Sequence, residues 1–279
     1  MSSIITLTTD FGHDDAYVAA LKGTILSTNP EATIVDISHS TEPQNILQAA
    51  FILGMAYRYF PKQTIHVAVV DPGVGSERQG IILKTPTALF VAPDNGVLSY
   101  IIDDLFLVES RSPTEYSQGP KEIVFKTGLE AVAITDPRFW RHPVSPTFHG
   151  RDIFAPVAAG LSLGISLYEF GEKIKSLHIL SIPKPLYDPD GNLVGLILHI
   201  DHFGTLITNI KNNELTGRDA SIDVAGHLIQ GINDYYAQKE GVMAILGSSG
   251  YLEVSLRDGS ACDFLGAMVG DEIKVLPTI

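Results

Sequence analysis

Three side chains from two segments could act together on a bound small molecule. Asp71 and Arg78 flank the turn sequence Pro-Gly-Val-Gly, which would return the guanidinium to the carboxylate and stabilise its charge. His149 lies on a loop that leads into a helix, where a histidine could be catalytic. The alternative for Asp71 and Arg78 is a turn with a surface ion pair. The alternative for His149 is an exposed or structural histidine on a loop. By themselves these residues predict a pocket but no definite reaction.

Asp10 is a fourth candidate, because it directly follows an apolar run that predicts the first strand. Ligands of open α/β sheets bind outside the carboxyl ends of the strands, and a carboxylate there can accept two hydrogen bonds from a ribose diol. The alternative is that Asp10 caps the following helix. His13, Asp14 and Asp15 suggest a metal-dependent phosphohydrolase more weakly, because adjacent residues at a helix start point in different directions.

Two polar segments near the C-terminus could bind the rest of a ligand. Asp201, Phe203 and Thr205 place a carboxylate, a ring and a hydroxyl at a strand bend, where the ring could stack on a base. Ser248 lies in a run of Gly and Ser that would let the backbone approach a ligand. The alternative for Phe203 is a place in the core.

The elements that must position these residues differ between the two parts of the chain. The first part alternates short apolar runs with helical patterns, which predicts an α/β domain with a mostly parallel sheet over residues 1–182. The Pro-rich residues 181–192 predict a linker, and residues 192–279 predict a smaller all-β domain resembling a barrel or sandwich. The expected strands are 4–8, 33–37, 64–70, 81–83, 89–92, 193–200, 206–210, 220–224, 227–229, 242–246, 252–255 and 272–275, and the expected helices are 14–26, 46–57 and 152–163.

The composition of the chain limits its expected binding partners and its expected cellular compartment. A net charge of -13 would repel a phosphate backbone, so nucleic acid is not an expected partner. We expect no membrane segment, because no apolar run approaches the roughly 20 residues that cross a bilayer. The single cysteine, Cys262, and the lack of a signal-peptide pattern predict a cytoplasmic protein.

Six motifs along the chain resemble those of one enzyme family. TTDFG, DPGVGSER, APDNG, FHGRD, DHFG with TNI, and SSGYLEV occur in this order. Together they resemble the S-adenosyl-L-methionine (SAM) hydrolases, also called SAM hydroxide adenosyltransferases, which are related to the fluorinase and chlorinase enzymes. The resemblance implies hydrolysis of SAM to adenosine and L-methionine, with no cofactor or metal. It also implies a homotrimer, with SAM bound between the N-terminal domain of one subunit and the C-terminal domain of its neighbour.

The resemblance also assigns roles to residues of this chain. It implies that Asp71, Arg78 and His149 are catalytic and that Asp10 binds the ribose. The substrate-binding positions that it implies in the C-terminal domain are Asp201, Phe203, Thr205, Ser248, Glu253 and Val254. Thr205 departs from the family, in which Asn is common at this position, and a hydroxyl offers fewer contacts to adenine than an amide does. The loop inserted in fluorinases after the second motif is absent here, which favours water over halide.

The expected mechanism is in-line attack of water on C5′ of the ribose, with methionine as the leaving group. Asp71 and His149 would orient and partly deprotonate the water, while Arg78 would fix Asp71 and favour hydroxide-like charge. Two alternatives remain open: a SAM-dependent halogenase, and a non-catalytic module that binds SAM or adenosine.

Overall fold

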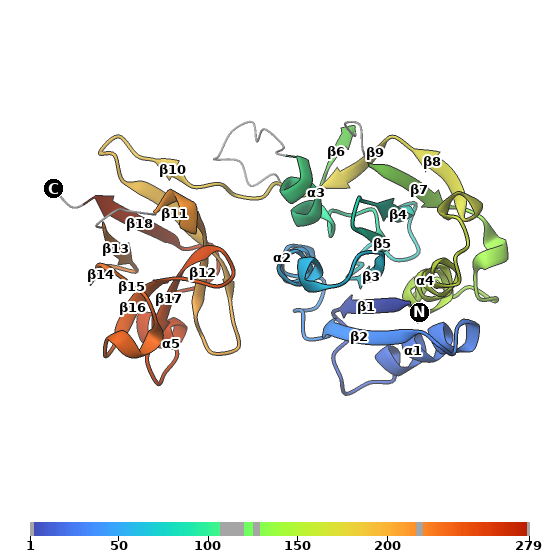
Figure 1. The fold of residues 1–279 in the computed structure, drawn as a ribbon, viewed down its shortest axis with the longest axis horizontal. Coiled ribbons are helices and arrows are strands. Elements are labelled where there is room, and N and C mark those ends of the chain that lie inside the picture. Colours follow the sequence, from blue (N-terminus) through green and yellow to red (C-terminus); the bar gives the residue numbers. More distant parts are fainter. Residues whose placement is uncertain (1–2, 107–119, 125–128, 216–219, 278–279) are drawn as a thin grey trace. The chain divides into compact units, whose positions relative to one another are not determined.

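The computed structural model describes residues 3–106, 120–124, 129–215 and 220–277. These residues form two compact units, which meet in the sequence between Ile182 and Pro183. The first unit is built on a sheet and helices, and the second is built mainly of strands (Figure 1).

The N-terminal unit contains a seven-stranded mixed sheet in the order β2-β1-β3-β5-β4-β7-β8. The strands β2, β1, β3 and β5 are parallel, and β4, β7 and β8 continue the sheet through antiparallel pairs. The parallel core was predicted, whereas β6 to β9 were not. The strands are β1 Ile4–Thr9, β2 Thr33–Ser38, β3 Thr64–Val69, β4 Gly80–Lys84, β5 Ala88–Pro93, β7 Glu130–Ile134 and β8 Gly171–Ile174, and a separate pair joins β6 Lys121–Val124 to β9 Ser176–Ile179.

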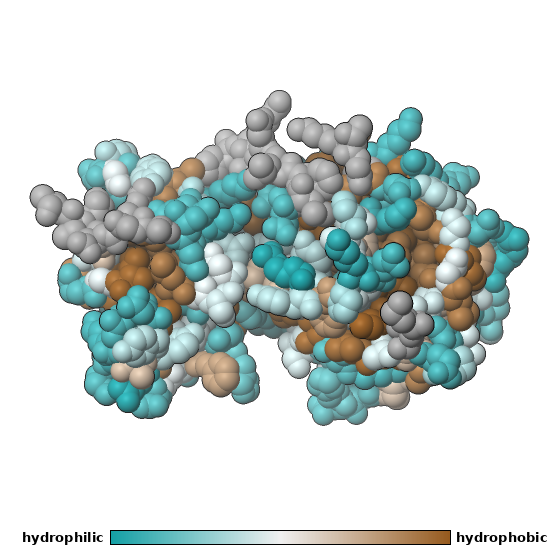
Figure 2. All heavy atoms as spheres, in the orientation of Figure 1, coloured by the Kyte–Doolittle hydropathy of each residue, from teal (hydrophilic) through white to brown (hydrophobic). Residues whose placement is uncertain are grey.

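Helices cover both faces of this sheet (Figure 1). The apolar core on one face includes α1 and α4, and the core on the other face includes α2 and α3. Hydrophobic residues remain visible at the surface around β7 and α4 (Figure 2). The helices are α1 Tyr17–Thr28, α2 Ile46–Ala56, α3 Ser99–Phe106 and α4 Ala155–Ser162, the last preceded by a π-helical turn Gly150–Phe154. Within the described ranges, no helix combines the length and apolarity needed to cross a membrane.

The start of α1 corrects one prediction. The helix begins at Tyr17 rather than at Asp14, because Gly12 adopts a left-handed conformation (φ 68°) and donates its N–H to the carbonyl of His39, 2.8 Å away. Residues 12–15 therefore belong to a turn. Tyr17 was expected on the apolar face of the helix, as was residue 26, but both are exposed. No side chain caps α1, so the alternative role of Asp10 as a helix cap is wrong.

The C-terminal unit is a near-closed β-barrel sheet with an apolar interior. Its strands follow the order β14-β13-β18-β11-β12-β17-β16-β15, with β10 paired to β11. The strand β10 and the turn after it lie within the expected linker, and β15 and the short helix α5 were not predicted. The elements are β10 Leu186–Tyr187, β11 Leu193–Ile200, β12 Leu206–Lys211, β13 Ala220–Val224, β14 His227–Gln230, β15 Ile232–Asn233, β16 Val242–Leu246, β17 Tyr251–Leu256, α5 Ala261–Leu265 and β18 Glu272–Pro277.

Candidate active site

The carboxyl edge of the parallel strands brings two of the expected carboxylates to one side of the N-terminal unit. The strands β1 and β3 are adjacent and parallel, with Thr9 paired to Val69. Asp10 and Asp71 therefore leave the sheet at the same edge. Asp10 is partly buried, and its Oδ2 accepts a hydrogen bond of 2.8 Å from the backbone N–H of Gln44.

Asp71, Arg78 and His149 form one contact set. The Nε of Arg78 donates to Oδ1 of Asp71 at 2.9 Å, and its Nη2 donates to Oδ2, so the pair is bidentate. The same Nη2 lies 2.9 Å from Nδ1 of His149. The side chains of Asp71 and Arg78 are only 5% and 12% exposed, so this is not a surface ion pair. The alternative interpretation of the turn is thereby excluded.

The contact with Arg78 determines which nitrogen of His149 carries a proton. A guanidinium can only donate, so Nδ1 must accept and the neutral ring carries its proton on Nε2. Burial lowers the pKa of His149, and the positive charge of Arg78 lowers it further. At neutral pH the ring is therefore uncharged and offers Nε2–H as a donor.

The loop between Asp71 and Arg78 is held from two sides. On the strand side, Nδ2 of Asn95, in the APDNG motif, donates to the carbonyl of Val70 at 2.9 Å and fixes the end of β3. On the other side, Gly75 has φ 78°, and a Cβ there would clash with the carbonyl oxygen of Pro146. Gly75 therefore lets this loop lie directly against the loop that carries His149.

We expect Gly75→Ala to lower stability and activity together. The left-handed conformation costs a non-glycine residue about 1 kcal/mol or more, and the clash with Pro146 adds to it by separating the two loops. The measurements are the Tm and kcat. Gly226→Ala is a matched control, because Gly226 also has a positive φ but a Cβ there meets nothing within 4 Å. Equal losses of activity in the two variants would contradict this role for Gly75.

Asp152 anchors the loop that carries His149. Its side chain is fully buried, and it accepts hydrogen bonds from Arg151 at 2.7 and 2.8 Å, from Arg141 at 3.3 Å and from the N–H of Ser145 at 2.9 Å. Burial opposes its charge, but these donors together hold the pKa of Asp152 below its usual value. Asp152 lies inside the π-helical turn, so its alternative role as a helix N-cap is wrong.

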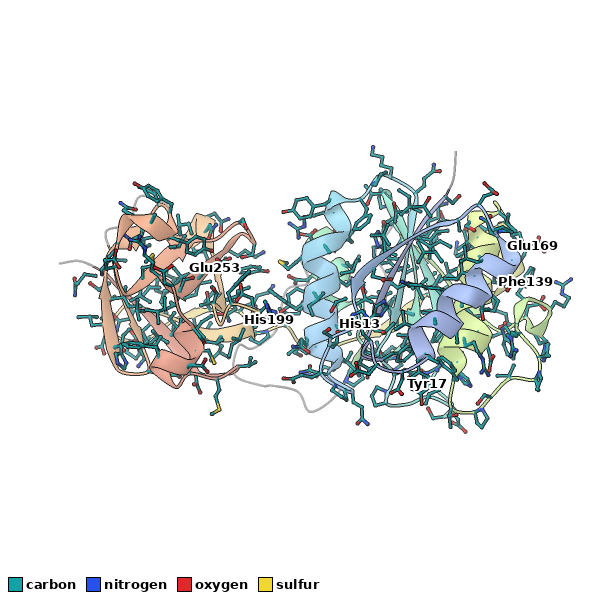
Figure 3. All side chains as sticks on the ribbon, turned by 90° about the horizontal axis from the view of Figure 1, so that it is seen from below. His13, Tyr17, Phe139, Glu169, His199 and Glu253 are labelled. Carbon is teal, nitrogen blue, oxygen red and sulfur yellow. The ribbon has the colours of Figure 1, made fainter. Side chains whose placement is uncertain are left out.

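Three aromatic rings next to this site were not predicted. Phe11, Tyr17 and Phe148 contact one another with centroids 5.4 to 5.9 Å apart, and the guanidinium of Arg151 lies 5.0 Å from the centre of the Phe148 ring. Figure 3 shows Tyr17 at the N-terminal end of α1. Their positions in the sequence could have indicated two of these rings, since Phe11 follows Asp10 and Phe148 precedes His149.

The acidic segment after Gly12 does not assemble into a metal site. His13, Asp14 and Asp15 are exposed. Across the described ranges, no three or more His, Cys, Asp and Glu side chains are grouped as metal ligands would be. The phosphohydrolase alternative therefore lacks the constellation it needs.

In the C-terminal unit, Asp201 organises the bend at the start of the DHFG motif. Its Oδ1 accepts hydrogen bonds from the N–H of Phe203 at 2.9 Å and of Thr205 at 2.8 Å. Phe203 is 77% exposed, so its alternative place in the core is excluded. The hydroxyl of Thr205 is buried and accepts a hydrogen bond from Ser255 at 3.3 Å.

Glu253, labelled in Figure 3, is a buried carboxylate of this unit. It accepts hydrogen bonds from Ser249 at 2.8 Å and from Tyr236 at 3.2 Å, and Tyr236 was not predicted. Burial raises the pKa of Tyr236, and the charge of Glu253 adds to this effect. Ser248 is exposed in the turn before β17, and the side chain of Val254 lies in the barrel core. A ligand could therefore reach Val254 only through its main chain.

Comparison with known proteins identifies relatives over nearly the whole chain. A model of the SAM hydroxide adenosyltransferase N-terminal domain matches residues 5–171, and a model of the corresponding C-terminal domain matches residues 195–274. The (R)-S-adenosyl-L-methionine hydrolase of Methanocaldococcus jannaschii is 33% identical, over 98% of this chain and 95% of the relative. The hydrolase of the same name from Salinispora arenicola is 32% identical, over 97% of each chain. A fluorinase from an Actinoplanes species is 28% identical, over 76% of this chain and 73% of the relative.

Two solved structures share the fold. An uncharacterized conserved protein from Thermotoga maritima matches with a TM-score of 0.83 and 32% identity, covering 98% of this chain and 99% of that one. A conserved hypothetical protein from Thermus thermophilus matches with a TM-score of 0.73 and 29% identity, covering 99% and 100%. The likeness therefore extends over both units.

Proposed function

Because the chain belongs to the SAM hydroxide adenosyltransferase family, we propose that it hydrolyses S-adenosyl-L-methionine to adenosine and L-methionine. The observation that carries this proposal is the buried contact set of Asp71, Arg78 and His149 at the carboxyl edge of the sheet. This is the edge at which ligands of α/β sheets bind. The named hydrolases among the relatives support the substrate.

The reaction needs an oxygen nucleophile placed in line behind C5′ of the ribose. The C5′–O bond forms as the C5′–S bond breaks, the bonding electrons go to sulfur, and one proton of the attacking water is released. Correct placement contributes on the order of 7 to 11 kcal/mol, whereas general base help contributes about 10²- to 10⁴-fold in rate. Positioning is therefore the main task of the protein.

We assign the three residues different parts in that task. In its neutral form His149 donates from Nε2 to the nucleophilic oxygen, because Nδ1 is engaged by Arg78. Asp71 is then the group that accepts a hydrogen bond from the attacking water. Arg78 fixes both partners and stabilises hydroxide-like charge. No metal is needed to activate the leaving group, because a sulfonium already departs as a neutral thioether.

Asp10 is proposed to bind the two hydroxyls of the ribose. Asp10→Asn keeps the size of the side chain and an acceptor for the Gln44 amide, but removes the charge. We expect the dissociation constant for adenosine to rise roughly ten- to a hundredfold, since hydrogen bonds to a charged group contribute more than neutral ones. Calorimetric titration measures this, with 2′,3′-dideoxyadenosine as the control ligand that should bind both proteins alike. An unchanged dissociation constant would refute the ribose assignment.

We also propose that the enzyme is a homotrimer whose C-terminal units complete the sites of neighbouring subunits. The exposed ring of Phe203 and the buried carboxylate of Glu253 support a ligand-binding face on this unit. If each site combines residues from two subunits, mixing Arg78→Ala chains with Phe203→Ala chains after mild dissociation should restore activity. Light scattering gives the oligomeric state. No recovery in mixed trimers would place both residues in the site of one subunit.

One incubation tests the function. The protein is supplied with each sulfur epimer of SAM in H₂¹⁸O, and mass spectrometry follows adenosine and methionine. The proposal expects both products and the label in the 5′-hydroxyl, with activity retained in EDTA. Parallel incubations with chloride and fluoride test the halogenase alternative through 5′-halo-5′-deoxyadenosine. Tight binding with no product over hours would instead support a non-catalytic module.

A further inference from the structure

Beside Asp10, four side chains form a hydrogen-bonded and ionic chain that the proposed reaction does not use. Thr9 is the last residue of β1, and its Oγ1 lies 2.8 Å from Nδ1 of His39, which follows the neighbouring strand β2. Nε2 of His39 lies 3.0 Å from Oδ1 of Asp36, and Lys22 lies 2.5 Å from Oδ2 of the same carboxylate. The ring of His39 is buried, while Asp36 and Lys22 are about one-third exposed at 34% and 33%.

The donors and acceptors in this chain can be assigned. The ionised carboxylate of Asp36 can only accept, so the proton of the neutral ring is placed on Nε2, which faces it. Nδ1 of His39 then accepts the hydroxyl proton of Thr9, whose oxygen also accepts the N–H of Phe11 at 3.2 Å. This N–H is not aimed straight at the carboxylate, so the contact is electrostatic rather than a linear hydrogen bond.

Both ends of the Asp10 turn are fastened to His39. The side chain of His39 contacts Thr9, which precedes Asp10, and the carbonyl of His39 accepts from the N–H of Gly12 at 2.8 Å. The β1–β2 register shifts between Leu7 and Thr8, and such an irregularity turns the following side chains to new directions. His39, which directly follows the next strand, therefore holds the backbone on both sides of Asp10, while the N–H of Gln44 binds the carboxylate itself.

We propose that His39, through Thr9, is a positioning residue that holds the Asp10 carboxylate in its ribose-binding orientation. This inference rests on the proposed role of Asp10. A positioning residue does not touch the ligand. Its removal should therefore weaken adenosine binding only in a protein whose Asp10 carboxylate is intact. A residue that merely stabilises the strand should change ligand binding little, whatever the state of Asp10.

A second threonine on the same strand provides a matched control. Thr6 is fully buried, as Thr9 is, and its Oγ1 lies 2.7 Å from Nδ1 of His66. Thr6→Val and Thr9→Val therefore both remove a threonine–histidine contact without changing side-chain shape much, although Thr9→Val also removes the acceptor of the Phe11 N–H. Thr6 lies three positions before the strand end, and its partner His66 belongs to β3 rather than to the Asp10 turn.

The experiment measures the dissociation constant for adenosine in Thr9→Val, Thr6→Val, Asp10→Asn and the double variant Thr9→Val/Asp10→Asn. We expect Thr9→Val to weaken binding roughly five- to tenfold, the scale of one hydrogen bond, and Thr6→Val to leave it unchanged while lowering the Tm. In the Asp10→Asn background, Thr9→Val should add nothing. Thr9→Ser, which keeps the hydroxyl, should restore wild-type affinity.

The possible failures are distinguishable. If Asp10→Asn leaves binding unchanged, the ribose assignment fails and the positioning role fails with it. If Asp10→Asn weakens binding but Thr9→Val does not, or if the two effects add, only the positioning role is refuted. Asp36→Asn provides a second test, because it acts on His39 and keeps the contact between Phe11 and Thr9, and it also serves should Thr9→Val not fold. It should weaken adenosine binding, and ¹⁵N spectra of the wild-type His39 ring should show Nδ1 unprotonated. A protonated Nδ1 would overturn the assignment.

Discussion

Arg78→Ala is expected to slow turnover by roughly 10²-fold or more and to leave adenosine binding nearly unchanged. The guanidinium makes two hydrogen bonds to Asp71 and one to His149, so its loss frees both partners from their common orientation. It also leaves the buried Asp71 carboxylate without its cation, beside the proposed position of the attacking water. Steady-state kcat and a titration with adenosine separate the two effects. A fall in affinity with unchanged kcat would make Arg78 a ligand-binding residue instead.

Two further variants sharpen this prediction. Arg78→Lys should not rescue turnover, because an ammonium cannot make the bidentate contact to Asp71 and also reach His149. Arg138→Ala is the control, because Arg138 also forms a bidentate pair, with Asp136, but is 72% exposed on the short helix η2 (Pro137–Phe139). That variant should keep its kcat. Full activity of Arg78→Lys would show that charge alone is sufficient.

The sequence predicts well what short-range patterns control. The apolar runs that become β1 and β3 end where polar residues begin, and parallel pairing then places Asp10 and Asp71 at one edge. The resemblance adds Arg78 and His149 to Asp71, and the structure brings the three together. Their catalytic role is a prediction, which the Arg78 variants test.

Contacts between distant segments explain what the sequence did not predict. The helix after Asp10 starts late because the N–H of Gly12 binds the carbonyl of His39, a bond that no local pattern indicates. Tyr236 carries no recognisable motif, and only the fold brings its hydroxyl to Glu253. Asp152 looks like a helix cap in sequence, yet the arginines on either side of it in the fold make it a buried anchor.

The second large effect concerns His149 and pH. Burial and the charge of Arg78 both lower its pKa, so the ring is neutral over most of the range in which enzymes are assayed. Protonation would put a cation against Arg78 and abolish the acceptor at Nδ1. We therefore expect kcat to be constant above the usual pKa of histidine and to fall as pH drops below the lowered value. In Arg78→Ala the fall of the residual activity at low pH should begin at a higher pH, because the pKa of His149 rises when the repelling charge is gone.

Substitutions at position 149 distinguish a donor from a base. His149→Ala should slow turnover by roughly 10²-fold or more and remove the acid limb of the pH profile. Glutamine can accept from Arg78 with its oxygen and donate with its amide nitrogen, as the neutral ring does, but it cannot take up a proton. If His149 acts as a donor, His149→Gln retains more activity than His149→Ala, with no acid limb. If the two variants are equally slow, the ring takes up the proton itself, and the assignment of Asp71 as the acceptor is wrong.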